Sequence, residues 1–413
     1  MKLKFLMATT VLGSAIIGAL ALGQSGTKLT VWMVGGDDDL KDLVPVISAY
    51  KAKYKGTEVQ TQAVPWGDAF TKYLAAVAGK TGPDIITGGL SYGIELGKQG
   101  GMINLKEKYP DLVASTSKTA NQGVMRSVVS TDGSVYGLPY DLTLQIMYYR
   151  KDIVTTAPRN WNEFTAALDK IRSSGGKGFA QQWGNAGWLG FFPYVYQAGG
   201  TFYDAKCSKA TINSAAGVTA LNYYGSLYTK FKSPTDGWPD MESGLENGEY
   251  PIGQTGNWAL FGIPAGRPKL EGKWAIATLP AGPAKKRTAF IGGRVIGIMS
   301  YSKNQDAAAN FLRTFYKSNI TTEVIKASAA RGNLFLPGGR QDMIPLVNLP
   351  TDQKSVLLKQ LADSEGPSNC PGWEQSGDAL QNAVQSVIFK GANAKEVLDA
   401  AAAEMDKNLV KYK

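Results

Sequence analysis

The chain has 413 residues, of which 44% are hydrophobic and 19% are charged, so it is long enough for two cores and leaves little room for long disorder. It contains no histidine and only two cysteines, which excludes Ser-His-Asp and Cys-His catalysis, histidine-liganded zinc and a histidine general base. Hydrolysis by paired carboxylates is not excluded, because it needs only Asp or Glu. The formal net charge is +10, but Lys and Arg are dispersed, with one tight basic cluster at residues 285–287. We interpret this excess as a solvated basic surface and expect no nucleic-acid partner.

Residues 1–23 have the pattern of a signal peptide. Lys2 and Lys4 precede an apolar run at 5–22, and Ala19-Leu20-Ala21 supplies a small-x-small cleavage site. An uncleaved membrane anchor is the alternative, but the run is short and rich in small residues. We therefore predict cleavage and export to the periplasm or the extracellular face of the cell envelope. Removal of Lys2 and Lys4 leaves 42 basic and 34 acidic residues, a net charge of 42 − 34 = +8.

The chain after residue 27 predicts alternating strands and helices. A buried strand is expected at 28–34 (KLTVWMV), followed by the loop 35–39 (GGDDD) and a helix at 40–54 with apolar residues at helical spacing. A second strand at 58–64 and a helix at 66–78 lead to a third short strand at 85–86. Ligands of open α/β sheets bind at the carboxyl ends of strands, so these loops are candidate sites. A phosphate loop at 78–81 (AGKT) is ruled out, because that motif requires glycine where Leu74 stands.

Residues 132–151 (DGSVYGLPYDLTLQIMYYRK) predict two strands, the second of which enters another domain. Asp132-Gly133 favours a tight turn, residues 142–149 are rich in β-branched and aromatic side chains, and Pro139 limits a ladder between them. This pattern, D-G-x-x-Y-G-L-P, a hydrophobic strand and then Tyr-Tyr-Arg-Lys-Asp, resembles the first interdomain crossing of the family 1 extracellular solute-binding proteins. These are the maltose-binding-protein-like sugar receptors of ABC importers.

Further segments resemble the same family in the same order. They include the Gly-x-Trp of residues 256–258, the link 274–283, the strand 290–298 and the helix start 302–311 (SKNQDAAANF). The resemblance implies an α/β fold with two lobes, a hinge that the chain crosses three times and a ligand cleft between the lobes. The first lobe would comprise residues 27–141 and 288–340, and the second lobe residues 142–287 and 341–413. The segment 158–164 predicts a helix that Asn160 caps and in which Trp161 is structural.

The resemblance also implies which residues would bind ligand. Trp258 would stack on a sugar, since a sugar ring presents an apolar face of C–H groups while its hydroxyls form hydrogen bonds. Asp37 and Asp38 would accept hydroxyl hydrogens, with helix capping as their alternative role. Aromatic residues of the glycine-rich segment 181–192 are either core plugs or stacking platforms, and Trp188 is favoured over Trp183. The full set of candidates is Asp37, Asp38, Trp66, Ser91, Tyr92, Tyr140, Asp141, Trp188, Trp258, Gly293, Arg294 and Trp373.

Arg294 and the two cysteines raise separate questions. Arg294 stands where many sugar receptors have tryptophan, and it would either hold hydroxyls or an acidic group of the ligand or form a surface salt bridge. Cys207 and Cys370 would share an oxidising compartment, where two cysteines more often pair than not. The family layout places both in the second lobe, which favours a disulfide between them.

The resemblance implies a receptor, not an enzyme, that works as a monomer without cofactor or metal. It would capture a carbohydrate, such as a di- or oligosaccharide of the maltose or trehalose type, and deliver it to the ABC importer permease. One alternative keeps the fold but binds a sugar phosphate or another acidic ligand, on account of Arg294 and the positive charge. The other is an exported glycosidase with two carboxylates among Asp37, Asp38 and Asp141.

Overall fold

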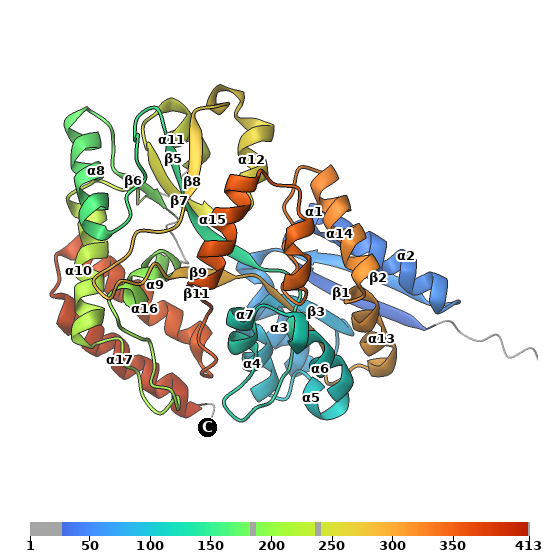
Figure 1. Ribbon diagram of the computed structural model, residues 1–413. Helices are drawn as coiled ribbons and strands as arrows, with labels where there is room; N and C mark the ends of the chain where they lie inside the picture. The colour runs from blue at the N-terminus through green and yellow to red at the C-terminus, as the bar shows by residue number, and fades with distance from the viewer. Residues whose placement is uncertain (1–26, 182–186, 236–240, 412–413) are drawn as a thin grey trace, which may run out of the picture.

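The computed structural model describes residues 27–181, 187–235 and 241–411, so the expected signal peptide lies outside the described residues. Within these ranges the strands form two mixed sheets, each flanked by helices (Figure 1). In the described ranges, no helix is both long enough and apolar enough to cross a bilayer.

The first sheet has the strand order β2-β1-β3-β10-β4. β1 pairs in parallel with β2 and β3, whereas β10 runs antiparallel to β3 and β4. Alternation in β1 buries Leu29, Val31 and Met33 in the core, and β4 ends at Pro139, which has no N–H to donate. The strands are β1 (Lys28–Val34), β2 (Glu58–Val64), β3 (Ile85–Gly89), β4 (Leu138–Pro139) and β10 (Arg294–Ile298). The helices of this lobe are α1 (Asp37–Leu40), α2 (Val44–Lys53), α3 (Trp66–Gly79), α4 (Tyr92–Lys98), α5 (Leu105–Lys108), α6 (Pro110–Thr119), α7 (Gln122–Val128), α13 (Gln305–Phe315) and α14 (Ser318–Ala330), with 3-10 turns η1 (Lys41–Leu43) and η3 (Gln341–Leu346).

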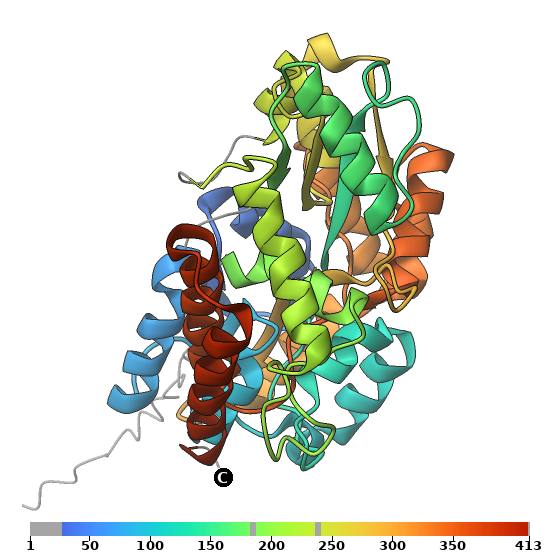
Figure 2. The ribbon, with the colours of Figure 1, turned by 90° about the vertical axis from the view of Figure 1, so that its left-hand side faces the viewer.

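The second sheet has the order β11-β9-β5-β7-β6, and β8 pairs with β5 outside this path. Its strands are β5 (Thr143–Arg150), β6 (Phe179–Gln181), β7 (Ile252–Gly256), β8 (Trp274–Ala277), β9 (Ala289–Gly292) and β11 (Ser364–Glu365). The helices of this lobe are α8 (Trp161–Ser173), α9 (Gly187–Gln197), α10 (Ala215–Thr229), α11 (Met241–Asn247), α12 (Ala259–Gly266), α15 (Thr351–Ala362), α16 (Trp373–Lys390) and α17 (Ala394–Lys411), with the 3-10 turn η2 (Pro268–Leu270). The last two helices, α16 and α17, lie side by side (Figure 2).

Local sequence explains several of these elements. The predicted strands 28–34 and 58–64 are confirmed at those bounds. The predicted cap of α8 is also confirmed: Asn160 Oδ1 accepts from the backbone N–H of Glu163 at 3.0 Å, and Trp161 is buried against Tyr223 with ring centroids 4.0 Å apart. The helix expected at 40–54 is divided instead into α1, η1 and α2. Its last part, α2, starts next to Pro45, since proline fits only in the first turn of a helix.

The chain passes between the two sheets at three places. β4 leads into β5 through residues 140–142, β9 leads into β10 through Gly293, and the third passage lies between η3, which contacts α14, and α15, which contacts β5, β8 and β9. The first two passages meet at Asp141, and Gly338, just before η3, lies next to it. A Cβ atom added to Gly293 would lie 2.4 Å from the carbonyl oxygen of Asp141, and one added to Gly338 would lie 2.6 Å from it. The glycines therefore allow this close approach, and the expected two-lobe α/β fold is confirmed.

The chain passes from one sheet to the other at residues slightly different from the expected lobe boundaries. We expect the first lobe to resume at residue 288, but β9 (Ala289–Gly292) pairs with β5 and β11 in the second sheet. Likewise, η3 (Gln341–Leu346) contacts α14 of the first lobe, although residues from 341 onward are expected in the second lobe. Only Gly293 separates β9 from β10, so the local sequence shows no break where the chain changes sheets.

Candidate functional site

The site is built on two sheet edges that the hinge joins. In the first sheet, the carboxyl ends of β1, β2 and β3 lie at the same edge as Arg294, because Arg294 at the start of β10 pairs with Gly89 at the end of β3. In the second sheet, the ends of β6 and β7 lie at the same edge as Thr143 and Gly292. The passages 140–142 and Gly293 connect these two edges directly. Loops that follow the strands of either sheet are thereby brought to the junction of the lobes.

Two tryptophans at these edges are open to solvent. Trp66 follows β2 at the start of α3 and is 51% exposed, and Trp258 follows β7 before α12 and is 44% exposed. The glycine of the Gly-x-Trp motif has a steric role, because a Cβ atom on Gly256 would lie 1.9 Å from the indole of Trp258. The ring of Trp258 lies against the end of β7. Each lobe therefore presents one solvent-exposed indole ring at its edge of the site.

Arg294 and Asp141 form a buried ion pair at the hinge. The Nε atom of Arg294 donates to Asp141 Oδ2 at 2.7 Å, a second bond joins Nη2 to the same oxygen, and the backbone N–H of Arg294 donates to Asp141 Oδ1 at 2.7 Å. Nη1 donates to Asp39 Oδ1 at 2.8 Å and to the carbonyl of Val34 at 3.2 Å. Burial lowers the pKa of Arg294, but the adjacent carboxylates outweigh it and hold the pKa above its usual range. The guanidinium of Arg294 is therefore already engaged with protein oxygens, and its ion pair with Asp141 is buried, not at the surface.

Tyr140 lies beneath this pair and is fully buried. The guanidinium carbon of Arg294 is 5.3 Å from its ring centroid, and its ring stacks on Phe315 with centroids 4.7 Å apart. These contacts give Tyr140 a packing role at the hinge in this structure.

The three consecutive aspartates of the first loop have different surroundings. Asp37 and Asp38 are exposed in the first turn of α1, where Asp38 accepts from Lys41 at 2.7 Å and from Asn333 at 2.6 Å. The hydrogen bond from Lys41 is the main cause of a lowered pKa at Asp38. Asp39, which the sequence analysis did not select, is the one that reaches Arg294. Nothing in the local sequence distinguishes it, because its partner lies 255 residues away.

Ser91 and Tyr92 follow β3 and are buried. The ring of Tyr92 lies over Gly88 and Gly89, where Cβ atoms would come within 2.5 Å and 3.1 Å of it. The hydroxyl of Ser91 donates to Glu374 of the other lobe. Glu374 and its neighbour across the lobes, Glu95, were not found by sequence reasoning.

Trp188 and Trp373 belong to one aromatic cluster in the second lobe. Their ring centroids are 5.3 Å apart, and Trp373 also packs edge-on against Phe202 at 5.2 Å. Trp373 is only 1% exposed, whereas Trp188 is half-buried at the start of α9. The lesser candidate Trp183 lies outside the described residues.

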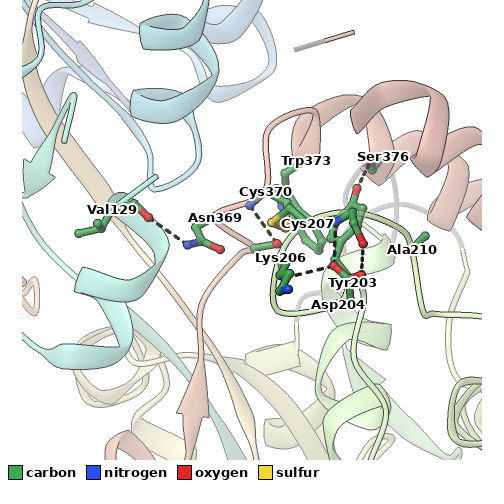
Figure 3. Close-up of a disulfide and its surroundings, with 12 residues drawn as sticks. Val129, Tyr203, Asp204, Lys206, Cys207, Ala210, Asn369, Cys370, Trp373 and Ser376 are labelled. Atoms are coloured by element: carbon green, nitrogen blue, oxygen red, sulfur yellow. Dashed lines mark hydrogen bonds between the residues drawn. A yellow bond between two sulfur atoms is a disulfide. The ribbon is translucent and has the colours of Figure 1, made fainter. Parts of the chain in front are cut away.

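Cys207 and Cys370 are joined by a disulfide with Cα atoms 5.4 Å apart, which attaches the loop after α9 to the segment before α16 (Figure 3). A cavity of about 270 Å³ lies elsewhere in the second lobe, between α8 and residues 153–156 and 248–251, and none of the candidate residues lines it. Across the described ranges, no group of three or more Cys, Asp or Glu side chains is placed to hold a metal ion.

The chain forms two α/β lobes joined by a three-segment hinge, and strand ends of both sheets lie at the junction. This arrangement defines the class of two-lobe binding proteins. A family model for bacterial extracellular solute-binding proteins matches residues 37–318, and the chain belongs to this family.

Similar proteins include a Brucella abortus (strain 2308) protein whose name describes a binding protein; it is 24% identical over 377 residues, which cover 89% of each chain. The diacetylchitobiose binding protein DasA of Streptomyces coelicolor is 26% identical over 331 residues, 75% of this chain and 74% of the relative. The crystal structure of the cyclic alpha-maltosyl-1,6-maltose binding protein from Arthrobacter globiformis superposes with a TM-score of 0.78 at 23% identity, over 94% of this chain and all of that chain.

Proposed function

We propose that this protein is the exported receptor of an ABC importer and that it captures a di- or oligosaccharide, of the maltose or trehalose type, between its lobes. It then delivers the sugar intact to the permease, as a monomer and without cofactor. The observation that carries the proposal is the pair of exposed tryptophans, Trp66 and Trp258, one at the joined edge of each sheet. Two of the similar proteins, the diacetylchitobiose binding protein DasA and the cyclic alpha-maltosyl-1,6-maltose binding protein, are named for carbohydrates.

Exposure of two large aromatic side chains at one junction supports a ligand with an apolar face. Tryptophan is highly buried on average, and Trp161 and Trp373 of the same chain follow that tendency. A sugar ring placed on an exposed indole removes apolar surface from water while its hydroxyl groups remain available for hydrogen bonds. One platform on each lobe suits a ligand of at least two rings.

Capture would proceed by closure about the hinge. A ligand that touches both lobes stabilises the arrangement in which the lobes are close, and it shifts the population only by its preference for that state. The pivot would lie where Gly293, between β9 and β10, and Gly338, just before η3, come close to the backbone of Asp141.

The two alternatives depend on residues that are already engaged. A sugar-phosphate site was motivated by Arg294, whose guanidinium forms four hydrogen bonds to protein oxygens. A glycosidase requires two available carboxylates among Asp37, Asp38 and Asp141, but Asp141 is bonded to Arg294 and Asp38 to Lys41 and Asn333. This leaves Asp37 without a second carboxylate of that set. We therefore retain the receptor as the proposed function.

A thermal-shift screen of the mature protein tests this proposal, with maltose, trehalose, maltotriose, diacetylchitobiose and glucose 6-phosphate as probes and product analysis on the same samples. A sugar at about 100 times its dissociation constant should add roughly 2.7 kcal/mol of stability. Trp258→Ala and Trp66→Ala should each weaken binding by about 2 kcal/mol, roughly 30-fold. Phe389→Ala, at a side chain that is 57% exposed on α16, is the matched control and should bind normally. No shift with any sugar, or cleaved sugar in the samples, would overturn the proposal.

A further inference from the structure

The segment before α16 lies between the lobes. It is attached to the second lobe by the disulfide from Cys370 to Cys207, and Figure 3 shows Asn369 beside it, directed toward Val129 at the end of α7 in the first lobe. The side-chain amide of Asn369 donates to the carbonyl oxygen of Val129 at 3.0 Å. The amino end of α16 is thereby held against the first lobe.

Glu95 of α4 caps this helix from the opposite lobe. Its Oε1 atom accepts from the backbone N–H of Trp373 at 2.6 Å, with a longer contact of 3.5 Å from the N–H of Glu374. The N-cap position itself is Gly372, which has no side chain to accept these bonds. Because the first N–H groups of a helix have no partner within it, the carboxyl group of Glu95 from the other lobe fills the role of the missing cap, and its Oε1 atom can accept whether or not the group carries a proton.

A second contact joins the same elements, since Ser91 donates its hydroxyl hydrogen to Glu374. Glu95 is 1% exposed and Glu374 is half-buried, and within the described part of the chain neither carboxyl group has an ion-pair partner. Burial raises the pKa of Glu95 to about 7, with the nearby charge of Glu374 adding to the effect, and burial also raises the pKa of Glu374. The other titratable groups facing the pair are Asp378 on α16, Tyr92 on α4 and Tyr203 after α9, while Lys98 on α4 pairs with Asp132.

We propose that Glu95 is a positioning residue for ligand capture, which fastens the amino end of α16 to the first lobe and makes lobe closure a proton-linked step. The proposal rests on the receptor function given above. Glu95 need not touch the sugar, because it acts by holding Trp373 and Glu374 of the second lobe in place.

The direction of the pH effect follows from the two states of the contact. With the lobes apart, Glu95 meets water and titrates near its usual value of about 4.3; with the lobes together, it holds its proton up to about pH 7. The closed form therefore binds more protons between these values, so closure is favoured at low pH. The equilibrium constant for closure decreases by up to about tenfold for each pH unit as pH rises through this interval, and it no longer changes with pH above pH 7.

The test measures closure with and without sugar. Small-angle scattering of the unliganded mature protein at pH 5, 6, 7 and 8 should give a smaller radius of gyration at pH 5 than at pH 8. Calorimetry with maltose as the probe should give a dissociation constant that rises about tenfold or more between pH 5 and pH 8. Glu95→Gln keeps the size of the side chain but cannot titrate, so both profiles should lose most of their change between pH 5 and pH 8, and only the contribution of Glu374 should remain. Glu374→Gln, a second variant, should move the change to lower pH. Glu58→Gln, at an exposed residue of β2, is the control and should behave as the parent.

The two proposals fail in different ways. No heat with maltose at any pH would count against maltose as a ligand, but the scattering series would still decide the role of Glu95. An unchanged radius from pH 5 to pH 8 in the parent, or an equal pH dependence in Glu95→Gln, would overturn the inference.

Discussion

Replacement of Arg294 by methionine should destabilise the protein strongly, because it leaves a buried carboxylate without its partner. The side chains of Arg294 and Asp141 are 9% and 8% exposed, and the pair is joined by two guanidinium hydrogen bonds. Removal of one member of a buried pair typically costs about 3–5 kcal/mol. For a lobe-sized folding unit this corresponds to a melting temperature roughly 6–20 °C lower.

Arg313 provides the matched control. It forms a similar two-bond contact with Asp111, at 3.0 Å and 2.9 Å, but the side chains are 35% and 66% exposed. Exposed pairs contribute about 0–1 kcal/mol, so Arg313→Met should lower the melting temperature by less than about 4 °C. The double variant Arg294→Met, Asp141→Asn should recover part of the loss, since no uncompensated charge remains. Equal melting temperatures for Arg294→Met and Arg313→Met in differential scanning calorimetry would refute this account of the hinge.

Three further predictions concern the backbone and the crosslink. Gly293→Ala should reduce stability well beyond Gly56→Ala in thermal melts. Both glycines have positive φ, +124° and +82°, but only the Cβ atom at 293 would meet backbone atoms, at Asp141. Similar losses for the two variants would contradict a steric role. Replacement of Cys207 and Cys370 by serine should lower the free energy of unfolding by up to about 5 kcal/mol, given their separation of 163 residues, and reductant should not affect the variant's melting temperature further. Asn160→Ala should cost about 1 kcal/mol in urea unfolding, and an unchanged midpoint would count against the α8 cap.

The parts of the fold that sequence predicted well depend on neighbours along the chain. The alternation of residues 28–34 predicts β1, and the Asn160 cap with Glu163 three residues later predicts the start of α8. The Gly-x-Trp motif is also local, since Gly256 makes room for the ring of Trp258 two residues on. The helix expected at 40–54 shows the limit of periodicity, because apolar spacing continues across the boundary between η1 and α2, where Pro45 lies in the first turn of α2.

The candidate site was predicted less completely, because exposure and partners depend on packing between distant segments. The sequence offers Trp66 and Trp373 alike as candidates, yet Trp66 is exposed and Trp373 is enclosed by aromatic rings of α9 and the following loop. Glu95 had no signal at all, since its partner Trp373 lies 278 residues away.

The sequence by itself determined the family, the two-lobe α/β architecture and the strand ends at which a site would form, since these follow from ordered local patterns. Only the tertiary structure decided that Arg294 is bound to Asp141 and Asp39 while Trp66 and Trp258 remain open to solvent. The physical reason is that hydrogen bonds and burial are set by which surfaces meet when the two lobes assemble. Arg294 lies 153 positions from Asp141 and 255 positions from Asp39 in the chain, and these residues become neighbours only then.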